Sequence, residues 1–398
     1  MSDLFIIGAS GTRAYRTAMA AIGENIANAS TDGYARRSVT TAESGASTST
    51  MAMYVSKANF GGTQVTSINR GTDPYLDATV RLTGMGLGSS TARLRWLSDA
   101  ENALNDTGTG IGALMTGMFQ NMEKLAASPS DTSLRVTTLD SISRVAQAFN
   151  QTAADLEAVS EGIATEAQAS VSTVNRSLEA LADINNSLLR AQPGTSAYSQ
   201  LLDSRDAALQ DLTENLNVTI SFGAHDSAQI SYGGQTLVQG NVAASLVANS
   251  NADGTLALTL ADGTALATPP NGALGGLFSA ASTVTDRRAS LDTIAGQFVT
   301  DMNAWHAQGV TDAGNAGAAL LSYGGSAASV AALITDPAEL ATRSSNGTLN
   351  GNLLTVTSTL RGNGSVEQAW TALIATHGNL LAATKSENTT AQSRSDQA

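Results

Sequence analysis

The sequence has 398 residues, of which 42% are hydrophobic, so it is long enough for two or three ordinary domains with buried cores. Its 34 acidic and 21 basic residues give a net charge of −13, which excludes a protein that holds nucleic acid by neutralising phosphates. The absence of cysteine excludes disulfides, thiolate metal sites and cysteine nucleophiles. Only 14% of the residues are charged, so Ser, Thr, Asn and Gln must supply much of the polar surface.

No segment is expected to enter a membrane. The only apolar run near the N-terminus, residues 4–7, has no basic residue before it, so it does not match a secretory signal. Residues 313–335 carry no charge, but they are too rich in Gly, Ser and Asn to span a bilayer. We therefore expect neither a cleaved signal peptide nor membrane insertion.

The first predicted element is an amphipathic helix over residues 4–26. Apolar and small residues recur every three or four positions along it, which places them on one face. Such a helix buries too little apolar surface to be stable alone in water, so it needs a partner helix. The residues of this predicted assembly face are Leu4, Ile7, Gly11, Tyr15, Ala18 and Ile22.

Helical periodicity dominates the centre of the chain. The longest apolar stripe covers residues 139–188 and contains no proline. A helix of about 50 residues is a rod of roughly 75 Å, and it cannot bury its stripe without other helices beside it. Shorter stripes that could pack against it are predicted over residues 92–104, 111–127, 201–216 and 277–305.

The pattern changes twice in the second half of the sequence. Between residues 218 and 268, apolar and polar residues alternate and turn residues recur, which predicts a small β-rich insert. Residues 309–360 are rich in Gly, Ser and Ala, and only a short helix near Ala338 is expected there. A last apolar helical stripe begins at Trp370.

These patterns predict a mainly α fold with a β-rich insert, arranged as a long antiparallel helical bundle with a small outer β domain. Four predicted domains follow from the same boundaries. They are residues 1–34, the N-terminal helix and the elbow after it; 35–216, the first part of the helical core; 217–273, the β-rich insert; and 274–398, the returning part of the core with a loop-rich section at 309–360.

No segment carries a catalytic or cofactor-binding pattern. The glycines at 84–88 lack the spacing and the lysine of a phosphate loop, and they predict a flexible break between helices. Asp203 and Asp206 flank Arg205 on a predicted helix, where a polar face explains all three. The histidines are too far apart to resemble a metal-binding pair. They are His225, His306 and His377. We therefore expect no enzyme activity, no cofactor and no metal.

One short motif stands out at residues 25–36. Residues 28–30 favour the end of the first helix, residues 32–33 can form a turn with positive φ, and Tyr34 can anchor the chain where it leaves. The motif residues are Asn25, Ile26, Ala27, Asn28, Thr31, Gly33, Tyr34 and Arg36.

This motif resembles the signature of the bacterial flagellar axial proteins, which is Asn, apolar, Ala, Asn, two variable residues, Thr, one variable residue, Gly and an aromatic residue. Residues 60–82, 201–206, 218–220 and 237–240 narrow the resemblance to the hook-associated protein 1 family, the junction proteins between hook and filament. The resemblance covers nearly all of residues 1–306 and is weaker beyond them.

The resemblance implies a structural role without a chemical reaction. Proteins of this family are exported unfolded through the flagellar type III apparatus and assemble, outside the cell, as a ring between hook and filament. It implies a flagellin-like core, with paired terminal helices lining an inner tube and the β-rich insert facing outward. The implied partners are further copies of the chain, the hook protein, a second hook-associated protein and an export chaperone.

The end of the sequence departs from the family pattern. The family ends in a long amphipathic helix that pairs with the N-terminal helix and carries the chaperone site. Here residues 388–398 form a polar tail without apolar periodicity, so we expect that pairing helix to be missing.

Two other functions fit parts of the sequence. A distal rod or hook protein shares the motif at residues 25–34, but such proteins are usually richer in β-structure and lack so long a central helix. A secreted coiled-coil adhesin would also have long helices and no catalytic residues. A circular dichroism spectrum dominated by strand would favour the first alternative, and binding to host cells without an effect on motility would favour the second.

Overall fold

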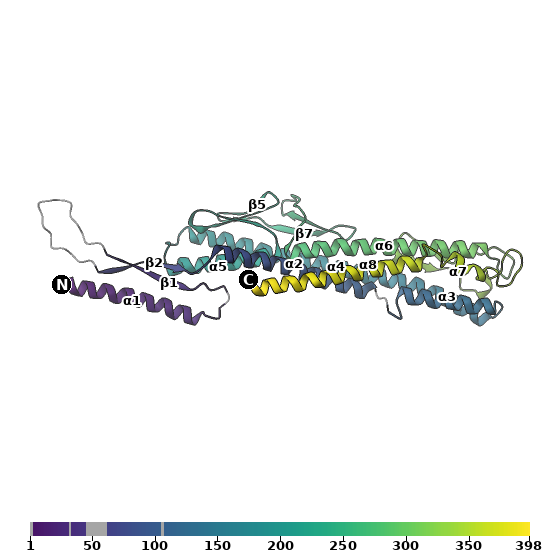
Figure 1. The fold of residues 1–398 in the computed structure, drawn as a ribbon. Helices are drawn as coiled ribbons and strands as arrows, with labels where there is room; N and C mark the ends of the chain where they lie inside the picture. Colours follow the sequence, from purple (N-terminus) through teal and green to yellow (C-terminus); the bar gives the residue numbers. More distant parts are fainter. Residues whose placement is uncertain (1–2, 32, 45–61, 105–106) are drawn as a thin grey trace.

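The computed structural model describes residues 3–31, 33–44, 62–104 and 107–398. The molecule is mainly α-helical, with small antiparallel sheets, and it is strongly elongated (Figure 1). The described residues up to 70 form an N-terminal unit, which projects beyond one end of the rest of the molecule. The remaining residues, from 71 onward, are called the body.

The N-terminal unit is one helix against one hairpin. Helix α1 covers Asp3–Ala27, and strands β1 (Arg37–Glu43) and β2 (Thr63–Arg70) pair antiparallel beside it. Residues 35–70 had been predicted to belong to the helical core, and that prediction is wrong for both strands. The stretch is rich in β-branched residues, which favour a pleated strand over a helix.

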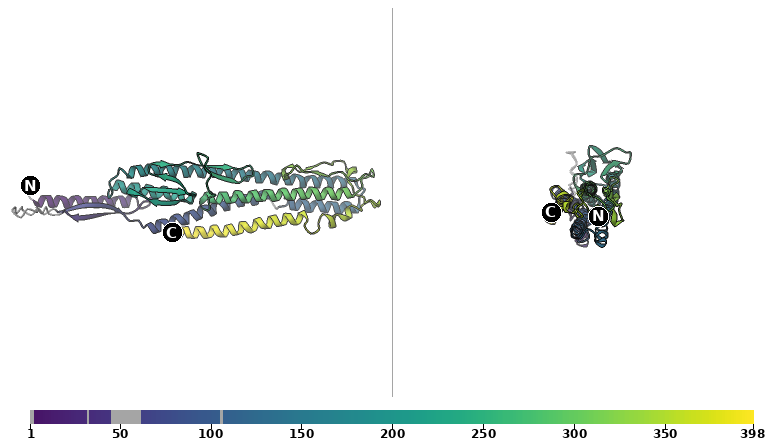
Figure 2. Two further views of the ribbon diagram at one scale, coloured as in Figure 1. Left: turned by 90° about the horizontal axis from the view of Figure 1, so that it is seen from above. Right: turned by 90° about the vertical axis from the view of Figure 1, so that its right-hand side faces the viewer.

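Five long helices and one of intermediate length form most of the body, together with short helical turns. The bounds are α2 Pro74–Leu104, α3 Ile111–Ala127, α4 Thr132–Leu188, α5 Ser196–Asn215, α6 Gly272–Gln308, η2 Ala327–Ser329, η3 Pro337–Glu339, η4 Leu353–Thr355, α7 Val356–Thr359 and α8 Val366–Gln397. Helices α2, α4, α6 and α8 run lengthwise beside one another, and seen from the end they form a narrow cross-section (Figure 2).

The central helix α4 confirms the longest predicted stripe. It begins at Thr132, earlier than the apolar pattern suggested, because the Asp131 carboxylate accepts hydrogen bonds from the backbone N–H groups of Ser133 and Leu134. Its 57 residues make a rod of roughly 85 Å. Its apolar side packs against α3, α5 and α6, so each of those helices buries its own stripe on the same rod.

The predicted break at the glycines of residues 84–88 is wrong, because α2 runs through them without interruption. One of these glycines, Gly88, serves close packing instead. A Cβ atom on Gly88 would lie 2.5 Å from the carbonyl oxygen of Glu214 at the end of α5. Where α2 meets α6, a Cβ on Gly276 would lie 2.1 Å from the carbonyl oxygen of Ser89. The helices therefore approach more closely than any side chain would allow.

The β-rich segment lies against α4 within the residues where it was predicted. Strands β3 (Thr219–Phe222), β4 (Ala228–Tyr232), β5 (Gln235–Gln239) and β6 (Val242–Ala243) form one antiparallel sheet, and β7 (Leu246–Ser250) pairs with β8 (Leu256–Leu260). A short turn, η1 (Ala224–Asp226), joins β3 to β4. Two asparagines on α4 fix this segment, because Asn185 bonds to the backbone of Ala228 and Asn175 to that of Leu246.

The polar tail predicted at residues 388–398 is instead helical as far as Gln397. Polar contacts with α2 replace an apolar seam at this end of α8. The Asn388 amide donates to the hydroxyl groups of Ser90 and Thr91, and Arg93 pairs with Glu387. A search for apolar periodicity could not find such a helix.

The loop-rich section, 309–360, wraps the end of α6. Its regular structure consists of short elements, the helical turns η2, η3, η4 and α7 and the strands β9 (Leu321–Ser322) and β10 (Ala331–Ala332). The buried side chain of His306 stabilises it. Its Nε2 atom accepts a hydrogen bond from the backbone N–H of Ala341, and its Nδ1 atom lies 2.6 Å from the carbonyl oxygen of Ala318. This arrangement requires the neutral imidazole with its proton on Nδ1.

We expect Gly276→Ala to destabilise the body by about 1–3 kcal/mol, because the new methyl group would collide with the backbone of α2. Gly117→Ala is the matched control: Gly117 lies inside α3 with nothing within 4 Å of an added Cβ, so this change should stabilise by about 0.5–1 kcal/mol. Urea unfolding followed by circular dichroism measures both. Equal effects from the two substitutions would contradict the close-packing role.

Stability should fall as the pH drops below about 6.5, the ordinary pKa of histidine. Burial lowers the pKa of both His306 and His377. Between the lowered value and 6.5 the unfolded chain binds more protons than the folded one, so stability falls as the pH falls through that window. We expect the Tm of His377→Leu to change less between pH 7.5 and pH 5.5 than that of the wild type. His225→Asn, at an exposed histidine, should keep the wild-type change.

Candidate functional site

The elbow between α1 and β1 is organised by Asn25. Its side-chain Nδ2 donates to the carbonyl oxygen of Arg37 at 2.9 Å, and its Oδ1 accepts from the backbone N–H of Arg37 at 2.8 Å. The hydroxyl of Tyr34 donates to the same Oδ1 at 2.9 Å. One asparagine on the last turn of α1 thus fixes both the start of β1 and the motif aromatic.

The turn itself is shaped by Asn28, Thr31 and Gly33. Asn28 donates from Nδ2 to the carbonyl oxygen of Glu24, and the Thr31 hydroxyl donates to Asn28 Oδ1. Gly33 has φ +75°, a conformation that other residues adopt only with strain. Asp32, which had been placed in the same predicted turn, lies outside the described residues. The other predicted motif residues Ile26 and Ala27 are exposed.

A largely buried network of three arginines and three carboxylates joins the N-terminal unit to α5. Its members, here called the elbow network, are Glu24, Arg37, Arg70, Asp203, Arg205 and Asp206.

The side chain of Arg37 is only 4% exposed and pairs with Glu24 and with Asp203, the latter at 3.2 Å. Arg70 bonds to Asp203 at 2.7 Å and to Asp206 at 2.9 Å. Because the charges balance within the network, each buried charge has a partner of opposite sign.

The sequence analysis missed this network. It singled out Arg36, whose side chain is exposed and whose carbonyl oxygen accepts from Gly71, whereas the buried cation is the next residue, Arg37. It also treated Asp203 and Asp206 as an ordinary polar face of a helix. The available signal was the pair of arginines at the two ends of a hairpin, Arg37 and Arg70, which antiparallel pairing places opposite each other.

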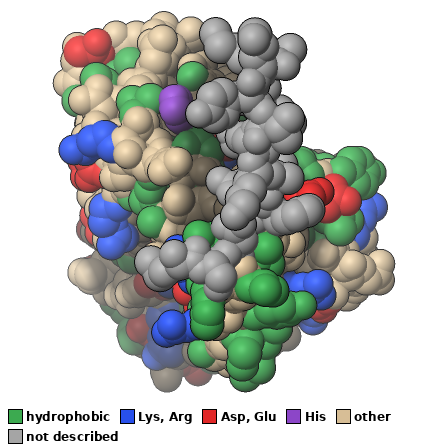
Figure 3. Space-filling model, turned by 90° about the vertical axis from the view of Figure 1, so that its left-hand side faces the viewer, with side chains coloured by type: hydrophobic (Ala, Val, Ile, Leu, Met, Phe, Trp, Pro, Cys, Tyr) green, Lys and Arg blue, Asp and Glu red, His purple; other side chains and the backbone are tan. Residues whose placement is uncertain are grey.

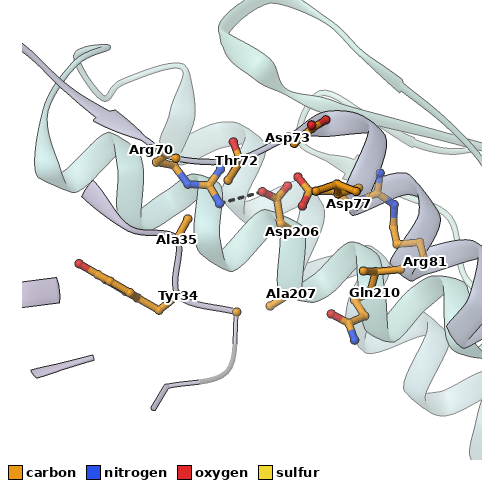
Figure 4. Close-up of a pocket in the computed structure, with 14 residues that line it drawn as sticks. Tyr34, Ala35, Arg70, Thr72, Asp73, Asp77, Arg81, Asp206, Ala207 and Gln210 are labelled. Atoms are coloured by element: carbon orange, nitrogen blue, oxygen red, sulfur yellow. Dashed lines mark hydrogen bonds and ion pairs between the residues drawn. The ribbon is translucent and has the colours of Figure 1, made fainter. Parts of the chain in front are cut away.

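Two hollows flank the elbow. One, of about 370 Å³, lies between the elbow and Asp203 on α5, and the other, of about 340 Å³, lies between the elbow and the first turns of α2. Figure 4 shows the second, with the side chains of Asp206 and Asp77 close beside each other and Arg70 bonded to Asp206. Burial raises the pKa of Asp77 above its ordinary value, and the charge of Asp206 adds to the shift.

Helix α1 has two faces with different partners. Ala14 and Ala21 are buried against the hairpin, and the Ser10 hydroxyl accepts from the N–H of Thr63. Three predicted assembly residues, Ile7, Gly11 and Ala18, are half-buried. The other three are exposed and share an adjoining face with further large apolar residues: Leu4 is 81% exposed and Tyr15 77%. This apolar stripe consists of Leu4, Tyr15, Met19, Ile22 and Ile26.

The exposed apolar side chains can be seen on the end of the molecule that carries α1. In Figure 3, hydrophobic side chains gather over the lower part of that end. A soluble protein rarely exposes a continuous apolar surface of this kind unless it is a contact surface. The site thus combines an elbow held by side-chain hydrogen bonds with a helix whose apolar stripe is exposed.

Within the described ranges, no group of three His, Asp or Glu side chains is arranged to hold a metal ion. No helix among those same residues has the length and hydropathy needed to cross a membrane.

Comparison with known proteins decides the family. A family model described as the flagellar hook-associated protein FlgK helical domain matches residues 97–321, more than half of the chain. The chain belongs to the FlgK family of flagellar hook-associated proteins. The matched FlgK region includes α4, α5 and the β-rich segment, and therefore Asp203 and Asp206, but it does not reach the elbow.

Individual FlgK relatives are distant. Flagellar hook-associated protein 1 of Salmonella typhimurium is 26% identical over 337 residues, which are 81% of this chain and 60% of that protein. The protein of the same name from Bacillus subtilis is 26% identical over 212 residues, 52% of this chain and 42% of that protein. The chain thus spans about 60% or less of the length of these relatives.

The fold is shared with a solved FlgK structure. The flagellar hook junction protein FlgK from Burkholderia pseudomallei superimposes with a TM-score of 0.57 at 23% sequence identity. The match covers 62% of this chain and 46% of that one. It shows a shared fold over that part of the chain.

We expect Arg37→Met to release the N-terminal unit from the body, because it leaves the carboxylates of Glu24 and Asp203 without their shared cation. Breaking one side of a buried pair costs about 3–5 kcal/mol, so exchange of the Ile68 amide, which bonds to Gly194 between α4 and α5, should speed up at least about 100-fold.

Arg36→Met is the matched control for this change, since it removes an exposed arginine from the adjacent position. It should leave the exchange of the Ile68 amide within about twofold of the wild type. Hydrogen exchange with mass spectrometry, or by NMR on a labelled sample, distinguishes the two variants. Slow exchange in Arg37→Met would show that the network does not hold the unit in place.

Proposed function

We propose that the chain is a structural component of the bacterial flagellum, an adaptor that joins the hook to the filament as a ring of copies. Membership of the FlgK family supports the flagellar setting, and the names of the relatives support the junction role. The observation that carries the proposal is the apolar stripe on α1, held in a defined position by the elbow and left exposed in the single chain.

The apolar stripe and the elbow network fit a role in assembly better than a role in catalysis. The apolar stripe gives a helix that gains stability only when another helix covers it, so association and ordering occur together. The elbow network fixes where that helix points relative to the body, as each copy in a ring needs the same geometry. In this scheme the predicted domains become an inner helix, a helical wall and an outer β-rich part.

Export through the flagellar type III apparatus belongs to the same proposal. A chain without cysteine forms no disulfide that would have to be opened before passage through a narrow channel. The hook protein, a second hook-associated protein and an export chaperone are the proposed partners. The location would be outside the cell, at the junction of hook and filament.

A distal rod or hook protein was the alternative that shared the elbow motif. The match of the FlgK helical domain over residues 97–321 and the length of α4 favour the hook-associated protein. The adhesin alternative has no specific observation in its favour.

The test places one charge on the apolar stripe. We expect Ile22→Asp to be exported normally but to support no filament, because a carboxylate at a contact between helices cannot be buried without a partner. Ala20→Asp adds the same charge at an exposed position off the stripe and should support filaments. Both are expressed in a strain of the source bacterium that lacks the native gene, with export measured in the culture medium and filaments counted by electron microscopy.

Full-length filaments with Ile22→Asp would contradict the role of the stripe. Loss of export in both variants would point to a defect before assembly, which the circular dichroism spectrum of each purified variant would reveal as misfolding. Swimming in soft agar gives an independent measure of the same outcome.

A further inference from the structure

The turn between β3 and β4 is strained. His225 and Asp226 both have φ +55°, in the left-handed region that residues other than glycine avoid. Two such residues in succession persist only where the surroundings hold them in place, since each costs of order 1–3 kcal/mol. The turn is exposed at the surface, so buried packing around it does not supply that restraint.

Two side chains of α5 restrain this turn. The hydroxyl of Tyr198 donates to the Asp226 carboxylate at 2.9 Å, and Arg205 Nη1 donates to the Asp226 carbonyl oxygen at 2.8 Å. Burial and the bond to Asp226 raise the pKa of Tyr198 to about 12, so the hydroxyl keeps its proton at neutral pH. The Arg205 guanidinium also stacks 4.5 Å from the centre of the Phe222 ring, at the end of β3.

The same arginine belongs to the elbow network. Its Nε and Nη2 atoms donate to Asp206 Oδ1 at 2.9 and 2.7 Å. The other oxygen of that carboxylate, Oδ2, accepts from Arg70 at 2.9 Å. Asp206 is therefore shared between one arginine of the body and one arginine of the N-terminal unit, and Arg205 is shared between Asp206 and the strained turn.

We propose that Arg205 is a positioning residue that couples docking of the N-terminal unit to the conformation of the β3–β4 turn. When Arg70 bonds to Asp206, the carboxylate has two cations and Arg205 is free to direct Nη1 at the turn. When Arg70 leaves, Arg205 is the remaining cation on Asp206 and is drawn toward it, which weakens the bond that holds the turn. The turn then relaxes out of the left-handed region.

The coupling connects two elements that each have two states. The N-terminal unit is docked on α5 or released, and the turn is strained or relaxed. Such a coupling is reciprocal, so loosening the turn must also weaken docking. It links the assembly helix to the outer β-rich part through neighbouring charged side chains, and no change in the helical body is needed.

The first experiment releases the N-terminal side and measures the turn. In Arg70→Met, the amides of Gly223 and Ser227, which bond within the turn, should exchange about 5- to 150-fold faster, the usual range of such couplings. Arg144→Met is the matched control, because it removes an arginine from an exposed pair with Asp140 far along α4. Its turn amides should exchange at the wild-type rate.

The second experiment acts in the opposite direction. Tyr198→Phe removes only the hydroxyl that holds Asp226, so the turn should loosen without a cavity in the core. The Ile68 amide, which reports docking of the hairpin, should then exchange several-fold faster. A residue that acts only on the turn would leave the Ile68 amide unchanged.

Two results would overturn the proposed coupling between docking and the turn. Faster exchange at Ile68 in Arg70→Met with unchanged exchange at Gly223 and Ser227 would overturn the coupling. If Arg70→Met disorders the whole hairpin, Arg70→Lys keeps the charge but loses the two-pronged geometry and should give a smaller increase at the turn. Unchanged Ile68 exchange in Tyr198→Phe, with a turn that has loosened, would also overturn the proposal.

Discussion

Asparagine side chains, most of them on helices, hold the backbone of several irregular segments in this molecule. A side-chain amide offers two N–H donors and a carbonyl acceptor, so it can bond to the N–H and C=O groups of a neighbouring backbone segment as another strand would. Buried backbone groups that lacked such partners would cost about 1–3 kcal/mol each. The pairs join Asn25 to Arg37, Asn150 to Ala327 and Val330, Asn175 to Leu246, Asn185 to Ala228 and Gly240, Asn303 to Leu320 and Leu321, and Asn352 to Trp305 and Ala341.

These asparagine–backbone bonds explain how an elongated protein with only 14% charged residues can hold its irregular segments in place. The helices bury their apolar stripes on α4. Asn175 and Asn185 attach the β-rich segment to this helix, and Asn150 together with the buried Arg135 attaches the loop-rich section. The six charged side chains of the elbow network lie at the joint between the N-terminal unit and α5. Hydrogen bonds between an amide and the backbone tolerate small shifts of the two partners. Two-pronged contacts from an arginine to carboxylates instead define how the N-terminal unit is oriented on α5.

The sequence predicted what depends on local periodicity and missed what depends on distant contacts. The stripe of α4 and the short helices beside it follow from a repeat of 3.6 residues, so they were found. The glycines of α2 and the polar end of α8 were misjudged because their partners lie on other parts of the chain. Gly88 meets Glu214 of α5, and Asn388 bonds to Ser90 and Thr91 of α2. The contact between Arg37 and Asp203 spans 166 positions, and no pattern within one segment reports it.

The length of α4 gives the elbow a mechanical meaning. A rod of roughly 85 Å acts as a lever, so an error of about 5° at one end displaces the other by about 7 Å. Neighbouring copies in an assembly could not match their surfaces with errors of that size. The angle at the elbow network therefore determines how accurately the far end of the molecule is positioned. Stiffening this joint with paired charges improves that positioning more than the same change would elsewhere along the rod.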